Sequence, residues 1–94
     1  MAEKELQIGQ LVYSRAGRDQ GRPFLVWDYL SDTMVAVVDG DLRKVESPKK
    51  KNIKHLKAMP AIAEEIARKK LAGVRIFNHE VRKALKDLGA IPEQ

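Results

Sequence analysis

Residues 9–27, GQLVYSRAGRDQGRPFLVW, contain two apolar runs separated by a glycine-containing segment. Residues 11–14 alternate as a half-buried strand does, and residues 24–27 (FLVW) begin a second apolar, β-rich run. Gly17 and Gly21 lie between these two runs. They indicate a turn, because glycine adopts the positive φ that a chain reversal requires without steric cost. The pattern predicts a strand over about residues 8–15 and a second over about residues 22–29, after a polar lead-in at residues 1–7. The connecting turn would display Arg15, Arg18 and Arg22.

Further strands follow along the chain. Thr33–Val38 (TMVAVV) is nearly all apolar and predicts a central buried strand. Asp39-Gly40 is typical of a type I′ hairpin turn, after which Leu42–Glu46 predicts an outward-facing strand that ends before Pro48. Ile53–Leu56 predicts a last short strand. About five short strands joined by tight turns favour a small, strongly bent barrel of SH3-like topology. The alternative is an open sheet with helices on one face.

The C-terminal third changes to helical periodicity. Pro60 suits the first turn of a helix that ends at Gly73, and Asn78 suits the N-cap of a second helix that ends near Gly89. The chain therefore divides into a β-barrel at residues 1–58 and a helical extension at residues 59–94. The two helices would share one apolar face, which consists of Ile62, Ile66, Val81, Leu85 and Leu88.

The positive charge of the chain is concentrated. The net charge is +5 over 94 residues, yet residues 1–41 carry four basic and seven acidic side chains. Residues 42–57 carry seven basic side chains against Glu46 alone. A concentrated basic patch favours a polyanionic partner through phosphate neutralisation and counterion release. The alternative is a solvated lysine-rich loop.

Several function classes lack the residues they require. The chain has no cysteine, which excludes disulfides, thiolate nucleophiles and cysteine-ligated zinc. His55 and His79 lie far apart without a histidine–carboxylate spacing, so we expect no metal and no cofactor. Neither a GxxxxGK loop nor a GxSxG elbow occurs, and Asp39 and Asp41 are typical of turn chemistry. We expect a protein that is not an enzyme and has no small-molecule substrate. Without a long apolar run or a signal peptide's apolar centre, we also expect a soluble, cytoplasmic protein with no membrane partner.

The glycine turn and the basic stretch carry a family resemblance. The strand–turn–strand with Gly17, Arg18, Asp19 and Gly21 resembles the KOW motif of ribosomal proteins and transcription elongation factors. The longer pattern VDGDLRKVESPKKKNIKHL, residues 38–56, is similar to bacterial KOW-domain RNA-binding proteins related to the archaeal and eukaryotic-type large-subunit ribosomal proteins of that class. The likeness covers about residues 8–57. It implies a role in translation, binding to ribosomal RNA and RNA contacts from the turn arginines.

We therefore predict an RNA-binding protein, with ribosomal RNA as the expected partner. Lysine prevails over arginine in residues 48–57, which suits phosphate contact rather than base reading. Local pairing of Arg18 or Arg22 with Asp19 is the alternative for the turn, and Phe24 and Trp27 favour the core over base stacking. The second hypothesis is a protein-interaction adaptor whose helices bind a ribosomal or transcription protein. The predicted nucleic-acid-binding residues are Arg15, Arg18, Arg22, Arg43, Lys44, Lys49, Lys50, Lys51, Asn52, Lys54, His55 and Lys57.

Overall fold

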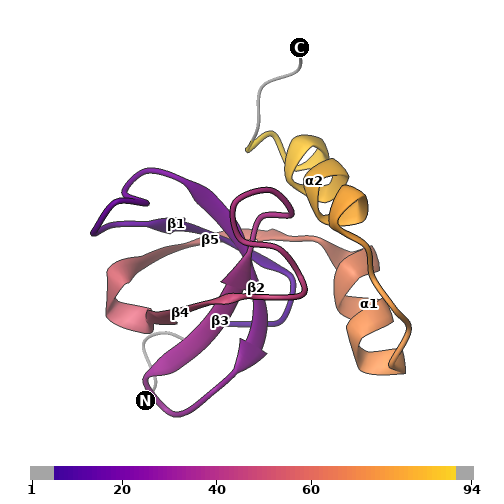
Figure 1. The fold of residues 1–94 in the computed structure, drawn as a ribbon, viewed down its shortest axis with the longest axis horizontal. Coiled ribbons are helices and arrows are strands. Elements are labelled where there is room, and N and C mark those ends of the chain that lie inside the picture. Colours follow the sequence, from indigo (N-terminus) through magenta and orange to yellow (C-terminus); the bar gives the residue numbers. More distant parts are fainter. Residues whose placement is uncertain (1–5, 91–94) are drawn as a thin grey trace.

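The computed structural model describes residues 6–90, so most of the predicted N-terminal lead-in lies outside the described residues. Five antiparallel strands form one sheet in the order β4-β3-β2-β1-β5, and two helices follow it (Figure 1). The prediction of a bent five-stranded sheet with a C-terminal helix pair is confirmed. The elements are β1 (Gln10–Ser14), β2 (Pro23–Tyr29), β3 (Met34–Val38), β4 (Lys49–Asn52), the 3₁₀ turn η1 (Ile53–His55), β5 (Leu56–Ile62), α1 (Glu64–Ala72) and α2 (Asn78–Asp87).

The sheet curls into a barrel-like shape, in which β1 pairs with both β2 and β5 and register shifts interrupt the β1–β5 and β2–β3 ladders. Strands β1 to β4 form a consecutive antiparallel meander. The short η1 turn then carries the chain from β4, at one edge of the sheet, to β5 at the other edge (Figure 1). This is the SH3-like strand arrangement expected from the spacing of short strands and turns.

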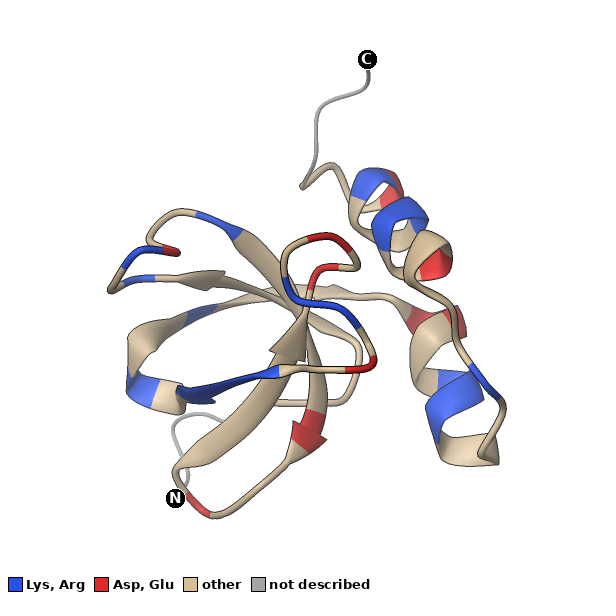
Figure 2. Ribbon diagram, in the orientation of Figure 1, with Lys and Arg blue, Asp and Glu red and all other residues tan. Residues whose placement is uncertain are grey.

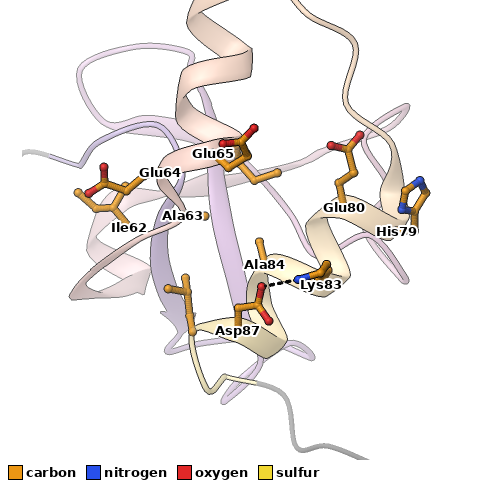
Figure 3. A pocket seen from close by; sticks show the side chains of 11 residues that line it. Ile62, Ala63, Glu64, Glu65, His79, Glu80, Lys83, Ala84 and Asp87 are labelled. Carbon is orange, nitrogen blue, oxygen red and sulfur yellow. Dashed lines mark hydrogen bonds and ion pairs between the residues drawn. The ribbon is translucent and has the colours of Figure 1, made fainter.

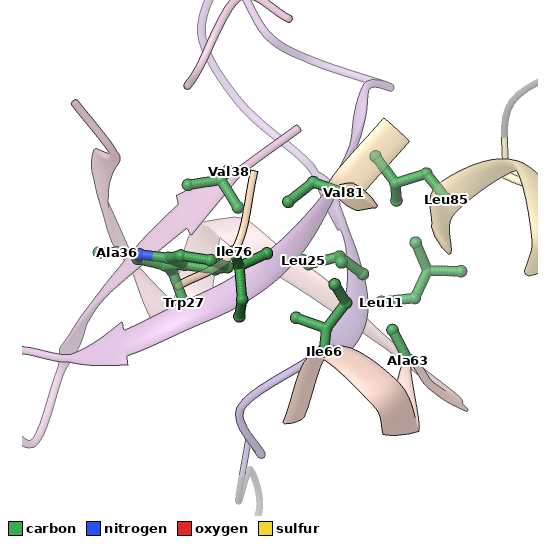
Figure 4. Packing of buried hydrophobic residues seen from close by; sticks show 10 residues of the cluster. All are labelled: Leu11, Leu25, Trp27, Ala36, Val38, Ala63, Ile66, Ile76, Val81 and Leu85. Carbon is green, nitrogen blue, oxygen red and sulfur yellow. The ribbon is translucent and has the colours of Figure 1, made fainter. Parts of the chain in front are cut away.

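Each face of the sheet has its own apolar cluster. Val12 and Phe24 are register partners, both fully buried, on the face that the curled sheet encloses. Leu11 and Leu25 are partners on the opposite face, which the two helices cover (Figure 4). Both faces are therefore apolar, which explains why β2 and β3 are continuous apolar runs rather than alternating ones. The helices contribute Ile66, Val81 and Leu85 to this second cluster, and the segment between them contributes Ile76.

The fourth strand is not where the sequence pattern placed it. Leu42–Glu46 lies in the loop between β3 and β4, and Lys49–Asn52 pairs with β3 instead. Asp39 does not have the positive φ that a type I′ turn requires; only Gly40 does. The Asp39 carboxylate accepts hydrogen bonds from the backbone N–H groups of Asp41 (2.9 Å) and Arg43 (2.8 Å). These bonds favour a compact loop over a tight hairpin.

The junction between sheet and helices also differs from the prediction. Pro60 lies within β5, an edge strand that pairs with β1 alone, and α1 begins at Glu64. An edge position tolerates a residue without an amide donor. Strand β5 therefore runs across the boundary expected at residue 58. The predicted strand at Ile53–Leu56 is instead the η1 turn followed by the start of β5.

The helix ends match the prediction in part. Gly73 ends α1 with a left-handed φ of 72°, as expected. Asn78 is not the N-cap of α2, because its Oδ1 accepts a hydrogen bond from the N–H of Val45 at 2.8 Å. Glu80 instead accepts from the N–H of Phe77 at 3.0 Å. Neither helix in the described part of the chain has the length and apolarity needed to span a membrane.

Candidate nucleic-acid interface

The fold places the glycine turn directly beside the lysine-rich stretch. The N–H of Arg15, where β1 leads into the turn, donates to the carbonyl oxygen of His55 at 2.8 Å. In the same pair of strands, Tyr13 lies opposite Lys57. Two segments that are far apart in the sequence therefore share one end of the molecule, where Figure 2 shows lysine and arginine on the turn, β4 and η1.

Some of these cations are internally paired. Asp19, at the tip of the glycine turn, is buried, with 7% of its side chain exposed. Its Oδ2 lies 3.3 Å from Nη2 of Arg43 and 3.7 Å from Nζ of Lys51. The Lys51 ammonium also donates to Oγ of Ser14 at 3.1 Å, and only 10% of its side chain is exposed. Lys51 is therefore a structural lysine that fastens β4 to the glycine turn.

The electrostatics of Asp19 follow from these contacts. Burial raises the pKa of its carboxyl, but the hydrogen bond from Arg43 and the charges of Arg43, Lys51 and Lys49 outweigh it and hold the pKa below its usual value. The ionised carboxylate is thus the stable form in the folded protein.

A second buried carboxylate holds Arg22. Oδ2 of Asp39 lies 3.4 Å from Nη2 of Arg22, and 5% of the Asp39 side chain is exposed against 40% for Arg22. Within residues 6–90, the buried Nε atoms of Arg22 and Arg43 have no hydrogen-bond partner, and each guanidinium is held through Nη2. We call Asp19, Arg22, Asp39, Arg43 and Lys51 the ionic cluster.

The remaining predicted cations are exposed, except Lys49, which is half-buried. Among residues 6–90, none of the lysines and arginines outside the ionic cluster that were predicted to bind nucleic acid forms an ion pair with a carboxylate. Lys44 stands apart from the others, on the loop before β4 and near Glu46. Asn52 is half-buried, and its Oδ1 accepts from the N–H of Lys54 at 3.0 Å, so it caps η1. We define the basic edge as Arg15, Arg18, Lys49, Lys50, Lys54, His55 and Lys57.

Most of the aromatic side chains lie away from the basic edge; Tyr13, opposite Lys57, is half-buried and packs against the helix-covered cluster. Phe24 and Trp27 are buried, and Lys70 covers Trp27 at 4.4 Å from the ring centroid. Tyr29 is 59% exposed, and its hydroxyl donates to the carbonyl oxygen of Leu6 at 2.8 Å. The basic edge contains no phenylalanine, tyrosine or tryptophan, so it offers charge and hydrogen-bond donors rather than a stacking platform.

The sequence pattern did not reveal the two buried carboxylates. Asp19 was expected to form a turn and to pair, if at all, with Arg18 or Arg22; its partners are Arg43 and Lys51. Both acids lie in turn segments next to strands that are apolar on both faces. That position was the one feature of the sequence that could have indicated their burial. No group of three or more metal-ligating side chains occurs within the described residues.

Compared with models of known protein families and with curated protein sequences, the chain gives no match. The resemblance to KOW proteins thus stays a prediction.

Proposed function

We propose that this protein is a non-enzymatic RNA-binding protein, and that its basic edge contacts the phosphates of structured RNA. The observation that supports the proposal is the juxtaposition of two distant segments whose cations form no ion pair with the carboxylates of residues 6–90, through the Arg15–His55 backbone bond and the Tyr13–Lys57 pairing. Ribosomal RNA is the proposed target and the cytoplasm the proposed location, as the KOW-like pattern of residues 8–57 implies.

The chemistry of the basic edge favours phosphate recognition. A lysine ammonium is a mobile point charge that neutralises phosphate without reading base sequence. The ionic cluster fixes the backbone beneath the basic edge, so little order is lost when RNA binds. Because Tyr13, the aromatic residue opposite Lys57, is half-buried and packed on the helix side, the favoured ligand is folded RNA with a defined phosphate arrangement rather than an unstacked single strand.

The binding test compares two triple variants of equal charge. Lys50→Ala/Lys54→Ala/Lys57→Ala removes three exposed cations of the basic edge. Arg68→Ala/Lys83→Ala/Lys86→Ala removes three exposed cations from the helices. Fluorescence anisotropy with a labelled ribosomal RNA hairpin should show at least a tenfold loss of affinity for the edge variant, because about three phosphate contacts disappear. The helix variant should stay within about twofold of the wild type.

Competition with duplex DNA of the same length tests the preference for RNA. The A-form helix presents 2′-hydroxyl groups and a phosphate spacing that B-form DNA lacks. We expect the RNA hairpin to compete more strongly than DNA.

In the anisotropy experiment, equal losses of affinity in the two triple variants would refute the basic edge as the binding surface.

A further inference from the structure

The two helices leave a groove on the side of the molecule that carries the helix pair. Its lining comes from the end of β5, from α1 and from α2, and encloses about 440 Å³ (Figure 3). Ile62, Ala63, Ala84 and Leu88 supply apolar walls, and Ile66 lies buried at the base. A space of this size accommodates one or two apolar side chains.

This groove includes only part of the apolar helix face that the sequence predicted. Val81 and Leu85 of that face are fully buried against the sheet and are unavailable to a partner, whereas Ile66, which is 2% exposed, also lines the groove. Ile62 and Leu88 are half-buried and line the groove too. The surface available for docking is therefore smaller than the predicted apolar face, and charged side chains surround it.

The rim is acidic on a protein whose net charge is +5. Four carboxylates line the groove, those of Glu64, Glu65, Glu80 and Asp87, against the ammonium of Lys83 and the imidazole of His79. Arg68 pairs with Glu65, Lys69 pairs with Glu80 and Lys83 pairs with Asp87. When these three cations are counted with the four carboxylates, the rim keeps one net negative charge. Glu64 is exposed and has no ion-pair partner within residues 6–90.

Two of the existing ion pairs are easily exchanged. In the pairs Glu65–Arg68 and Lys83–Asp87, each side chain is at least 60% exposed. Exposed ion pairs of this kind contribute little to the free energy of unfolding. A cation from a partner can therefore take over either carboxylate at small cost. Apolar walls with an acidic rim on both helices match a ligand that combines apolar and cationic side chains.

We infer that the α1–α2 groove binds a cationic peptide segment that inserts an apolar side chain between Ile62, Ala84 and Leu88 and places its charges against Glu64 and Glu65. RNA does not fit this groove because carboxylates repel phosphate. The inference does not depend on RNA binding by the basic edge, which lies at the far end of the barrel from the helices (Figure 2).

The test uses the full chain and a fluorescein-labelled probe peptide, KLKKLK, in an anisotropy titration. We expect saturable binding, with at least tenfold weaker binding for KSKKSK, which lacks the apolar anchors, and for ELEELE, which reverses the charge. Glu64→Lys/Glu65→Lys should weaken KLKKLK binding about tenfold, which corresponds to about 1.4 kcal/mol. The single change Glu64→Gln, which is less disruptive to the first turn of α1, should weaken it about threefold.

Asp32→Lys/Asp41→Lys is the matched control, because it makes the same change in net charge at two exposed turn positions outside the groove. We expect it to bind KLKKLK within twofold of the wild type. Amide chemical-shift changes on adding the peptide should concentrate at Ile62, Ala84 and Leu88. Equal weakening in the groove variant and the control would overturn the inference. The inference would also be overturned if binding did not saturate or if the chemical-shift changes were confined to β4. A dimer detected by sedimentation, with its interface at the groove, would overturn it as well.

Discussion

Replacing Lys51 with methionine separates the structural lysine of β4 from its solvent-exposed neighbour. Lys51 is the partner of Val35 in the β3–β4 ladder, and its ammonium reaches Ser14 and Asp19. Methionine keeps most of the apolar stem and volume but removes the charge and the donor. Asp19 stays buried, with Arg43 as its remaining ion-pair partner.

The magnitude follows from the geometry of the pair. At the 3.7 Å separation of Lys51 Nζ and Asp19 Oδ2, the gross attraction is about 4 kcal/mol at an effective dielectric constant of about 20. Relief of lysine desolvation offsets part of this loss, and Arg43 continues to neutralise Asp19. The lost hydrogen bond to Ser14 adds about 1 kcal/mol. We therefore expect a net destabilisation of about 2 kcal/mol, which for a chain of this size lowers Tm by about 10 °C.

Urea unfolding measures this difference, and Trp27 serves as the fluorescence reporter because it is buried, with 7% of its surface exposed. The unfolding midpoint should fall while the m value stays the same. Lys50→Met is the matched control: Lys50 is exposed on the same strand, and its loss should cost less than about 0.5 kcal/mol. Equal stability of the two variants would refute the structural role assigned to Lys51.

Two further predictions concern the ionic cluster and the glycines. Because the folded pKa of Asp19 lies below its unfolded value of about 3.9, its contribution to stability is complete above that pH and is lost as the pH falls through the folded pKa. Acid titrations of Trp27 fluorescence should therefore show a flatter decline of stability for Asp19→Asn, and a decline parallel to the wild type would contradict the pairing. Gly40→Ala should cost more than about 2 kcal/mol, because φ is +78° and the new Cβ would lie 2.5 Å from the Asn78 carbonyl oxygen. Gly17→Ala, at φ +76°, would place its Cβ more than 4 Å from every described residue other than its chain neighbours, so it should cost only about 1 kcal/mol in the same urea assay. Equal losses would contradict the close approach at Gly40.

The sequence predicted most of the sheet because local signals and tertiary packing agree there. Gly17 and Gly21 both have positive φ, at 76° and 87°, and the strands on either side pair as expected. Val35 and Val37 face one cluster while Ala36 and Val38 face the other, so an unbroken apolar run was a reliable sign of a central strand.

The prediction of β4 failed because two segments competed for the same edge of β3. Leu42–Glu46 has the better alternation, but Lys49–Asn52 gains the Lys51 contacts to Ser14 and Asp19. Those contacts join residues that are distant in sequence, so they cannot be predicted from a local sequence pattern. For the same reason, the pattern could not distinguish Lys51 and Arg43, which are paired internally, from Lys50 and Lys54, which are exposed.

The salt dependence of RNA affinity shows whether the basic edge binds phosphates. For the wild-type chain and a structured ribosomal RNA hairpin, log K should fall linearly with log salt concentration, with a slope of about −3 to −4 if about four cations of the basic edge contact phosphates. Lys50→Ala/Lys54→Ala/Lys57→Ala should make the slope shallower by about one per cation removed, whereas Lys51→Met should leave it unchanged. A flat salt response of the wild type, or an unchanged slope in the triple variant, would contradict the account.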